Sequence, residues 1–136
     1  MAIIQTVDLT KKFGNFTAVD HLNLSIEEGE IFGLLGPNGA GKTTTLLMLV
    51  TVIKPTKGTA YVDGYDITRE PDKARRLIGM AFQDPKLMWV VTPWDVLNWH
   101  AKVCGLSSLE RKKRVKWALT ELGLWENRHK SVHTFS

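Results

Sequence analysis

The feature of this sequence that most constrains its fold is a glycine-rich run between residues 36 and 44. It matches the phosphate-loop pattern G-x-x-x-x-G-K-[ST] at every required position, with Gly36, Pro37, Asn38, Gly39, Ala40, Gly41, Lys42, Thr43 and Thr44. Such a loop joins a strand to a helix, because its backbone N–H groups and the helix N-terminus must converge on phosphate oxygens. The run therefore predicts an α/β fold with a nucleoside triphosphate site.

The segments that flank the loop agree with this prediction. Residues 30–35 are short and mostly apolar, which predicts a buried strand, and residues 42–50 contain good helix formers. We expect Lys42 to reach the β- and γ-phosphates, Thr43 to place its hydroxyl on Mg²⁺, and Thr44 to add a donor to the α/β-phosphates. The alternative is a glycine-rich turn that binds no ligand.

Periodicity along the chain predicts a sheet-rich part followed by a helical part. Strands are expected over residues 3–9, 22–26, 59–62 and 78–82, a hairpin turn over 13–16, a second turn at Asp63-Gly64, and a short helix over 71–77. Capping patterns at Thr92 and Ser107 predict two longer helices that end near Val103 and Leu122. We place the boundary so that residues 1–82 form an antiparallel sheet with a partial phosphate-loop core, and residues 83–136 a partial helical subdomain.

Composition and charge limit the remaining possibilities. Hydrophobic residues make up 43% of the 136 residues, and no apolar run approaches the roughly 18 residues of a membrane span. The first residues lack the pattern of a signal peptide, so a cytoplasmic protein is expected. Residues 102–130 hold eight basic and three acidic side chains, which suit a solvated helix face or an anionic partner. Cys104, the single cysteine, is expected to be a small buried hydrophobe rather than a nucleophile.

Several segments together resemble the ATP-binding subunit of an ABC transporter. They are the phosphate loop with its proline and asparagine, Phe13, the segment 58–67, the segment 80–85 around Gln83, and Thr134-Phe135-Ser136, which resembles the start of the signature motif. Within the family, the sequence is most similar to subunits of multidrug or antibiotic ABC-2-type exporters. The resemblance implies an incomplete ABC ATPase fold, a type of P-loop NTPase, with an N-terminal antiparallel β-subdomain and part of the helical subdomain.

The resemblance also implies roles for individual residues. Phe13 would stack on adenine, unless it is an ordinary apolar residue of a hairpin. Gln83 would approach Mg²⁺ and the attacking water, unless it only caps a strand end. Residues 83–94 would contact the transmembrane permease subunits, although Leu87, Met88, Trp89 and Trp94 suit a protein core equally well. The implied cofactors are ATP and Mg²⁺, the implied partners include a second ATP-binding subunit, and the implied location is the inner face of the cell membrane.

The sequence stops at Ser136, where the family's signature motif would continue with two glycines and a glutamine. Ser136 would act on the ATP of the opposite subunit, and the acidic residue that activates water is missing. We therefore expect this chain to bind ATP weakly without turning it over, while a longer parent hydrolyses ATP to power transport. The alternatives are a non-hydrolytic nucleotide-binding module and an ABC-type ATPase that acts on nucleic acid. Nucleic acid is not expected, because the basic run 111–116 contains no aromatic residue. Exposed sheet edges predict self-association.

Overall fold

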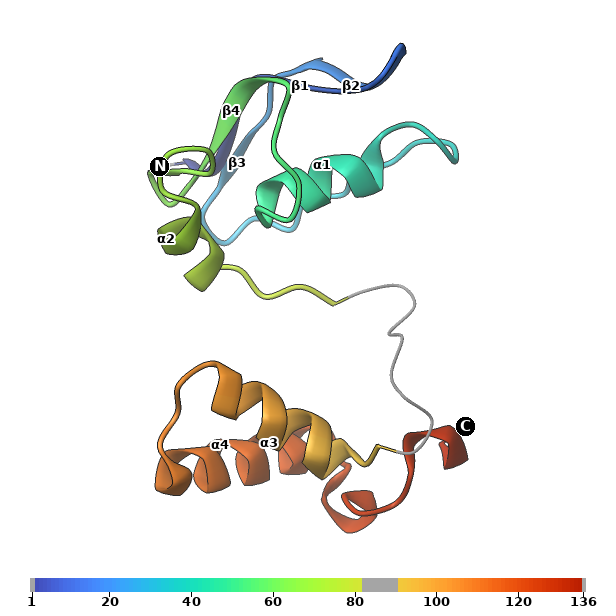
Figure 1. Ribbon diagram of the computed structural model, residues 1–136, viewed down its shortest axis with the longest axis vertical. Helices are drawn as coiled ribbons and strands as arrows, with labels where there is room; N and C mark the ends of the chain where they lie inside the picture. The colour runs from blue at the N-terminus through green and yellow to red at the C-terminus, as the bar shows by residue number, and fades with distance from the viewer. Residues whose placement is uncertain (1, 82–90, 136) are drawn as a thin grey trace. The chain divides into compact units, whose positions relative to one another are not determined.

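The computed structural model describes residues 2–81 and 91–135 of the chain (Figure 1). The chain divides into two compact units, Met1–Ala81 and Phe82–Ser136. The first contains the strands and the phosphate loop, and the second contains two longer helices.

The first unit is built on an antiparallel sheet whose central member is β1, Ala2–Phe13. One side of β1 pairs with β2 and β3, and the other side pairs with β4, which in turn pairs with β5. These strands span Phe16–Leu22, Ser25–Glu27, Lys57–Val62 and Tyr65–Asp66, respectively. The N-terminal antiparallel sheet expected from the sequence is therefore present.

The expected single strand over residues 22–26 is interrupted, and Thr6 shows why. The Thr6 hydroxyl donates to the carbonyl of Leu22 at 2.8 Å and accepts from the N–H of Leu24 at 2.8 Å. A side chain of β1 therefore satisfies backbone groups at the break, where β2 ends and β3 has not begun. Alternation of apolar residues continues through this break, so the pattern could not indicate it.

The two expected turns are confirmed. Phe13 pairs with Phe16 across the β1–β2 hairpin, and Val62 pairs with Tyr65 across the turn between β4 and β5. Local signals sufficed at both places, because a two-residue loop with glycine favours a tight hairpin turn.

Helix α1, Lys42–Leu49, follows the phosphate loop as expected, and α2, Pro71–Arg76, follows β5. Met48 and Leu49 of α1 are buried and belong to one cluster with apolar residues of the sheet and of α2. The other buried members of this core are Leu9, Val19, Ala60, Val62, Ile67 and Ala74. Burial of this cluster fixes the phosphate-loop helix against the sheet.

Two expected strands are wrong. Residues 30–35 carry no strand, and the side chains of Ile31 and Leu35 are fully or almost fully exposed, at 101% and 92%. Residues 78–81 also carry no strand, and Phe82 lies outside the described residues. An apolar run becomes a strand only when a neighbouring strand offers ladder hydrogen bonds. Within residues 2–81 and 91–135, no strand pairs with either segment.

The second unit is a helical hairpin followed by two short 3₁₀ helices. Its elements are α3 (Pro93–Val103), α4 (Ser108–Glu121), η1 (Trp125–Asn127) and η2 (Val132–Thr134). The expected N-caps are confirmed, since the Thr92 hydroxyl accepts from Asp95 N at 3.1 Å and the Ser107 hydroxyl from Glu110 N at 3.3 Å. Both helices begin where a side-chain oxygen satisfies a backbone donor of the first turn.

The packing of this unit bears on two expectations about single residues. Trp94 is half-buried, and its ring lies edge-on to that of Trp125, with centroids 6.3 Å apart. Cys104, by contrast, is exposed, and the expectation that it is buried is wrong. Its sulfur lies 3.6 Å from Nε2 of His100, because residues four apart share one face of a helix. His100 is also exposed.

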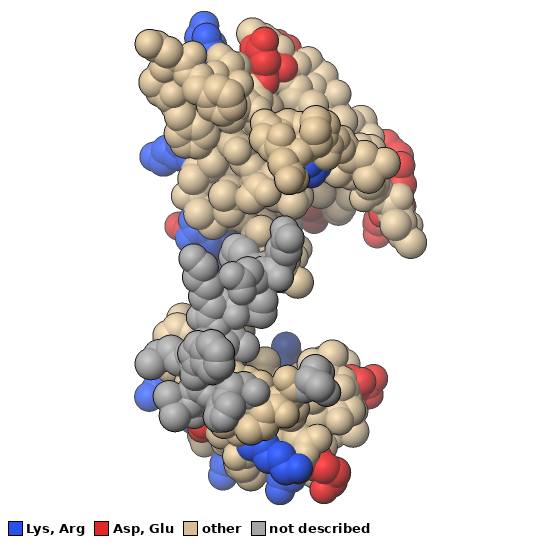
Figure 2. All heavy atoms as spheres, turned by 90° about the vertical axis from the view of Figure 1, so that its right-hand side faces the viewer, with Lys and Arg blue, Asp and Glu red and all other residues tan. Residues whose placement is uncertain are grey.

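The surface of the second unit is charged with both signs, as Figure 2 shows by blue and red side chains. Two of its basic residues lie against an aromatic ring, with Lys116 Nζ and the Arg128 guanidinium 5.3 Å and 4.2 Å from the centre of Trp125. Among the residues that the structure describes, no helix has the length and apolar character needed to cross a bilayer.

Candidate nucleotide-binding site

The phosphate loop ends in a helix start that suits an anion. Gly41 is the N-cap of α1, and the first helical hydrogen bond runs from Thr45 N to Gly41 O at 2.8 Å. The N–H groups of residues 42–44 therefore precede the hydrogen-bonded ladder of the helix. No acidic residue occupies the first turn of α1, so nothing there opposes the positive end of the helix dipole.

Lys42 folds its side chain back onto the loop. Its ammonium group donates to the carbonyl oxygens of Gly36 and Pro37, at 2.6 and 2.7 Å. The loop is closed further by a turn in which Ala40 N donates to Pro37 O at 3.2 Å. One cation and the backbone donors of the helix start thus lie at the same loop, which is the donor set that recognises phosphate.

Gly41 also brings the loop against β2. A Cβ atom on Gly41 would lie 2.2 Å from the carbonyl oxygen of Ala18, so only glycine allows this approach. Beside the contact is a cavity of about 210 Å³, whose lining includes Ala18, Asp20, Ala40 and Lys42. The phosphate loop and the β1–β2 hairpin therefore form one continuous region of the first unit.

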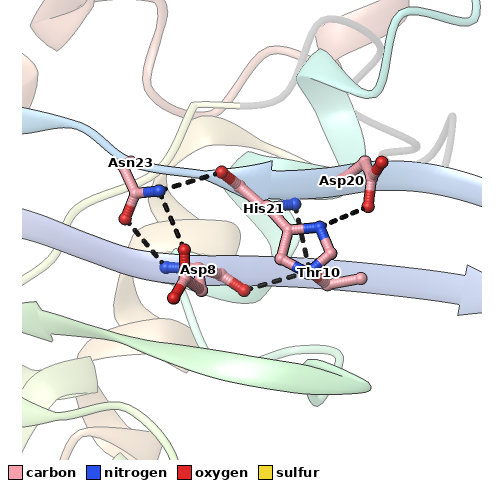
Figure 3. A network of polar contacts seen from close by, with 5 residues as sticks. All are labelled: Asp8, Thr10, Asp20, His21 and Asn23. Atoms are coloured by element: carbon pink, nitrogen blue, oxygen red, sulfur yellow. Dashed lines mark hydrogen bonds and ion pairs between the residues drawn. The ribbon is translucent and has the colours of Figure 1, made fainter.

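A polar network holds the base of this hairpin, as Figure 3 shows. The Asn23 side chain accepts from Asp8 N at 2.9 Å and donates to the Asp8 carboxylate at 3.0 Å, while Asn23 Nδ2 also donates to His21 O. The Thr10 hydroxyl accepts from His21 N at 3.1 Å, and His21 Nδ1 lies 2.7 Å from the Asp20 carboxylate. Two residues of the network have positive φ angles: His21, at 43°, where the β1–β2 register shifts, and Asp8, at 47°, where the β1–β4 register shifts. Nothing in the alternation of the sequence indicated these register shifts.

Phe13 lies at the end of β1, in the hairpin, and 51% of its surface is exposed. In the view of Figure 1, the hairpin and the phosphate loop extend toward the same side of the first unit. The ammonium group of Lys11 lies over the ring, 5.1 Å from its centre, and sequence reasoning missed this residue. An exposed ring offers a flat apolar surface on which a base can stack.

The remaining predicted site residues divide into two groups. Thr43 is exposed in the first turn of α1, and its hydroxyl is a hard oxygen ligand of the kind that Mg²⁺ prefers, so the loop fits this ion. Thr44 follows it and is half-buried. Gln83, Leu87, Met88, Trp89 and Ser136 lie outside the described residues.

Comparison with known proteins decides the family. The sequence pattern of a family described as ABC transporter matches residues 19–136. The chain belongs to the ABC transporter family. Members of this family bind ATP, typically with Mg²⁺, and their ATP-binding subunits pair with membrane components and with a second ATP-binding subunit.

Named relatives of this ABC chain include proteins associated with import and with multidrug transport. It is 43% identical over 136 residues to the spermidine/putrescine import ATP-binding protein PotA of Nitrosomonas europaea, covering 100% of this chain and 37% of that protein. It is 40% identical over 122 residues to the probable multidrug ABC transporter ATP-binding protein YbhF of Escherichia coli, covering 90% of this chain and 21% of that protein. The chain thus spans well under half the length of these relatives.

A solved structure confirms the fold class. CbiO1 from Clostridium perfringens, described as part of the ABC transporter complex cbiONQ, superposes with a TM-score of 0.82 at 29% identity. The match covers 99% of this chain and 56% of that one. The fold is therefore part of an ABC ATPase fold, with the antiparallel sheet and helices expected from the sequence.

Proposed function

We propose that this chain binds Mg²⁺-ATP at the phosphate loop, and that it belongs to a protein whose ATP hydrolysis powers transport across a membrane. The observation that carries the proposal is the convergence of the Lys42 ammonium group and the start of α1 on one glycine loop. Lys42 and the N–H groups of residues 42–44 would hold the phosphates, with Mg²⁺ on Thr43. Mg²⁺ neutralises phosphate charge when it is bound.

The proposal extends to the parts of the chain and their partners. Residues 1–82 would hold the nucleotide, with adenine on Phe13, while residues 83–136 would contact transmembrane subunits through the region from Gln83 to Trp94. Gln83 would approach the Mg²⁺ ion, and Ser136 would reach the nucleotide of a second ATP-binding subunit. Association with the cytoplasmic face of a membrane follows from these partners. The name of YbhF supports a multidrug transporter, whereas the name of PotA supports an importer.

Calorimetric titration of Mg²⁺-ATP into the chain and into Lys42→Ala tests the proposal. A charge-assisted hydrogen bond contributes about 1.5–3 kcal/mol, so the variant is expected to bind at least about tenfold more weakly. Lys12→Ala is the matched control, because Lys12 is an exposed lysine on β1 whose N–H, not its side chain, donates to the Thr56 hydroxyl at 3.0 Å.

Phosphate release measured on the same samples separates binding from hydrolysis. Binding without release would support a nucleotide-binding chain whose hydrolysis requires the longer protein. Equal affinity for ATP in the wild type and in Lys42→Ala would contradict the proposed site.

A further inference from the structure

We propose that Lys11 is a positioning residue for the base of the nucleotide, because it holds and polarises the Phe13 ring on which the base would stack. This inference rests on the proposed function and adds a residue to it. It starts from the ammonium group of Lys11, which lies 5.1 Å from the centre of the Phe13 ring. A lysine within about 6 Å of a ring centre is attracted to the ring face.

The Lys11 side chain is itself fixed in place. Its Nζ atom donates to the backbone carbonyl of Lys54 at 2.7 Å. Lys11 is half-buried, whereas the neighbouring Lys12 is exposed, so the two adjacent lysines differ in their surroundings. An anchored ammonium group defines one side of the ring, and 51% of the surface of Phe13 remains exposed for a ligand.

The anchor joins the hairpin to the segment that leaves the phosphate-loop helix. Lys54 lies between the end of α1 and the start of β4. Next to it, Thr56 N donates to Thr10 O at 2.8 Å, and Lys12 N donates to the Thr56 hydroxyl at 3.0 Å. These bonds hold β1 to the chain that follows α1, so the ring has a fixed place relative to the helix that begins at the phosphate loop. A nucleotide needs such a fixed spacing between its base and its phosphates.

The charge also selects the kind of ligand that stacks on the ring. A cation on one face draws electron density toward that face, which leaves the opposite face less negative. The negative face of an electron-rich purine then meets less repulsion in an offset stack. The geometry therefore favours a purine base on Phe13. In this arrangement Lys11 acts through the ring and makes no contact with the phosphates.

Five proteins and two ligands test this inference by calorimetry in the presence of Mg²⁺. The proteins are the wild type and the variants Lys11→Met, Lys11→Arg, Lys12→Met and Phe13→Ala, and the ligands are ATP and inorganic tripolyphosphate. Lys11→Met removes the charge and keeps most of the side-chain length. We expect it to weaken ATP binding by up to about two- to fivefold, the full value of an exposed cation–π contact, and to leave tripolyphosphate binding unchanged. Lys11→Arg keeps the charge and should bind ATP as the wild type does, and Lys12→Met should change the binding of neither ligand.

The outcomes separate this inference from the proposed function. Equal losses for ATP and tripolyphosphate in Lys11→Met would overturn it, because Lys11 would then act as a phosphate-directed charge. If Phe13→Ala weakens ATP binding and Lys11→Met does not, the role of Lys11 is refuted while the site stands. If the wild type binds neither ligand, the proposed function fails and the inference fails with it.

Discussion

Two glycines of the phosphate loop provide a matched pair for measuring what the contact with β2 contributes to stability. Gly39 and Gly41 have nearly equal φ angles, +83° and +84°. A Cβ atom on Gly39 would have nothing within 4 Å, whereas one on Gly41 would lie 2.2 Å from Ala18 O and 3.1 Å from a methyl group of Val19. The two alanine substitutions therefore share the backbone strain and differ in the steric conflict.

The expected costs follow from these two terms. An alanine in the left-handed region costs about 1–2 kcal/mol, which is the whole effect expected for Gly39→Ala. Carbon–oxygen contacts in proteins stay above about 3 Å, so Gly41→Ala must move the start of α1 away from β2 by about 1 Å. Overpacking of this size adds about 1–3 kcal/mol, giving about 2–5 kcal/mol in total. That loss is a large part of the stability of a typical domain.

Urea unfolding without nucleotide measures this difference. All five tryptophans lie between residues 89 and 125, so their fluorescence reports on the second unit, and the sheet must be followed by amide hydrogen exchange of β1 and β4. Gly41→Ala should lower the protection of these strands more than Gly39→Ala does. Equal costs for the two variants would refute the argument that the Gly41–Ala18 approach stabilises the fold.

Two further predictions concern acid stability and association. Burial raises the pKa of Asp66, but hydrogen bonds from Thr68, Thr59 and Arg69 outweigh this and lower the pKa below its usual 3.8. A lowered pKa stabilises the fold above pH 3.8, and this stabilisation is lost as the pH falls through the pKa of Asp66 in the folded protein. Acid unfolding followed by circular dichroism should show this loss in the wild type and not in Asp66→Asn. A pH dependence shared by both proteins would contradict this assignment. The exposed Ile31 and Leu35 predict self-association, which sedimentation should detect at high concentration and which Ile31→Glu with Leu35→Glu should abolish. Leu109→Glu, at an exposed leucine of the second unit, is the control, and a monomeric wild type at every concentration would count against the prediction.

Features that depend on neighbouring residues in the sequence were predicted correctly. The start of α1, the Phe13–Phe16 hairpin and the N-caps Thr92 and Ser107 all follow from local rules. Each involves hydrogen bonds or backbone angles within a few residues, so the sequence carries the whole signal.

Features that depend on distant residues were predicted wrongly or not at all. An apolar run indicates a strand at residues 30–35, but pairing with another strand decides whether one forms. The exposure of Cys104 depends on which face of α3 packs against α4. Within the candidate site, the loop and its donors were expected, whereas the position of Lys11 over Phe13 depends on a bond to Lys54, 43 residues away.

The two hydrogen bonds from the Lys42 ammonium group to the loop carbonyls affect both the rate of phosphate binding and the conformational entropy that the loop loses on binding. They tie residues 36 and 37 to the first residue of α1, so the curvature of the loop is acquired when the chain folds. A loop that is ordered in this way loses little conformational entropy on association, and preorganisation of this kind favours affinity. When a phosphate group enters the loop, its oxygens would replace the two carbonyl oxygens as acceptors for the Lys42 ammonium group. A rotation of the lysine side chain can accomplish this within nanoseconds. Association would then be limited by diffusion to the loop rather than by rearrangement of the backbone.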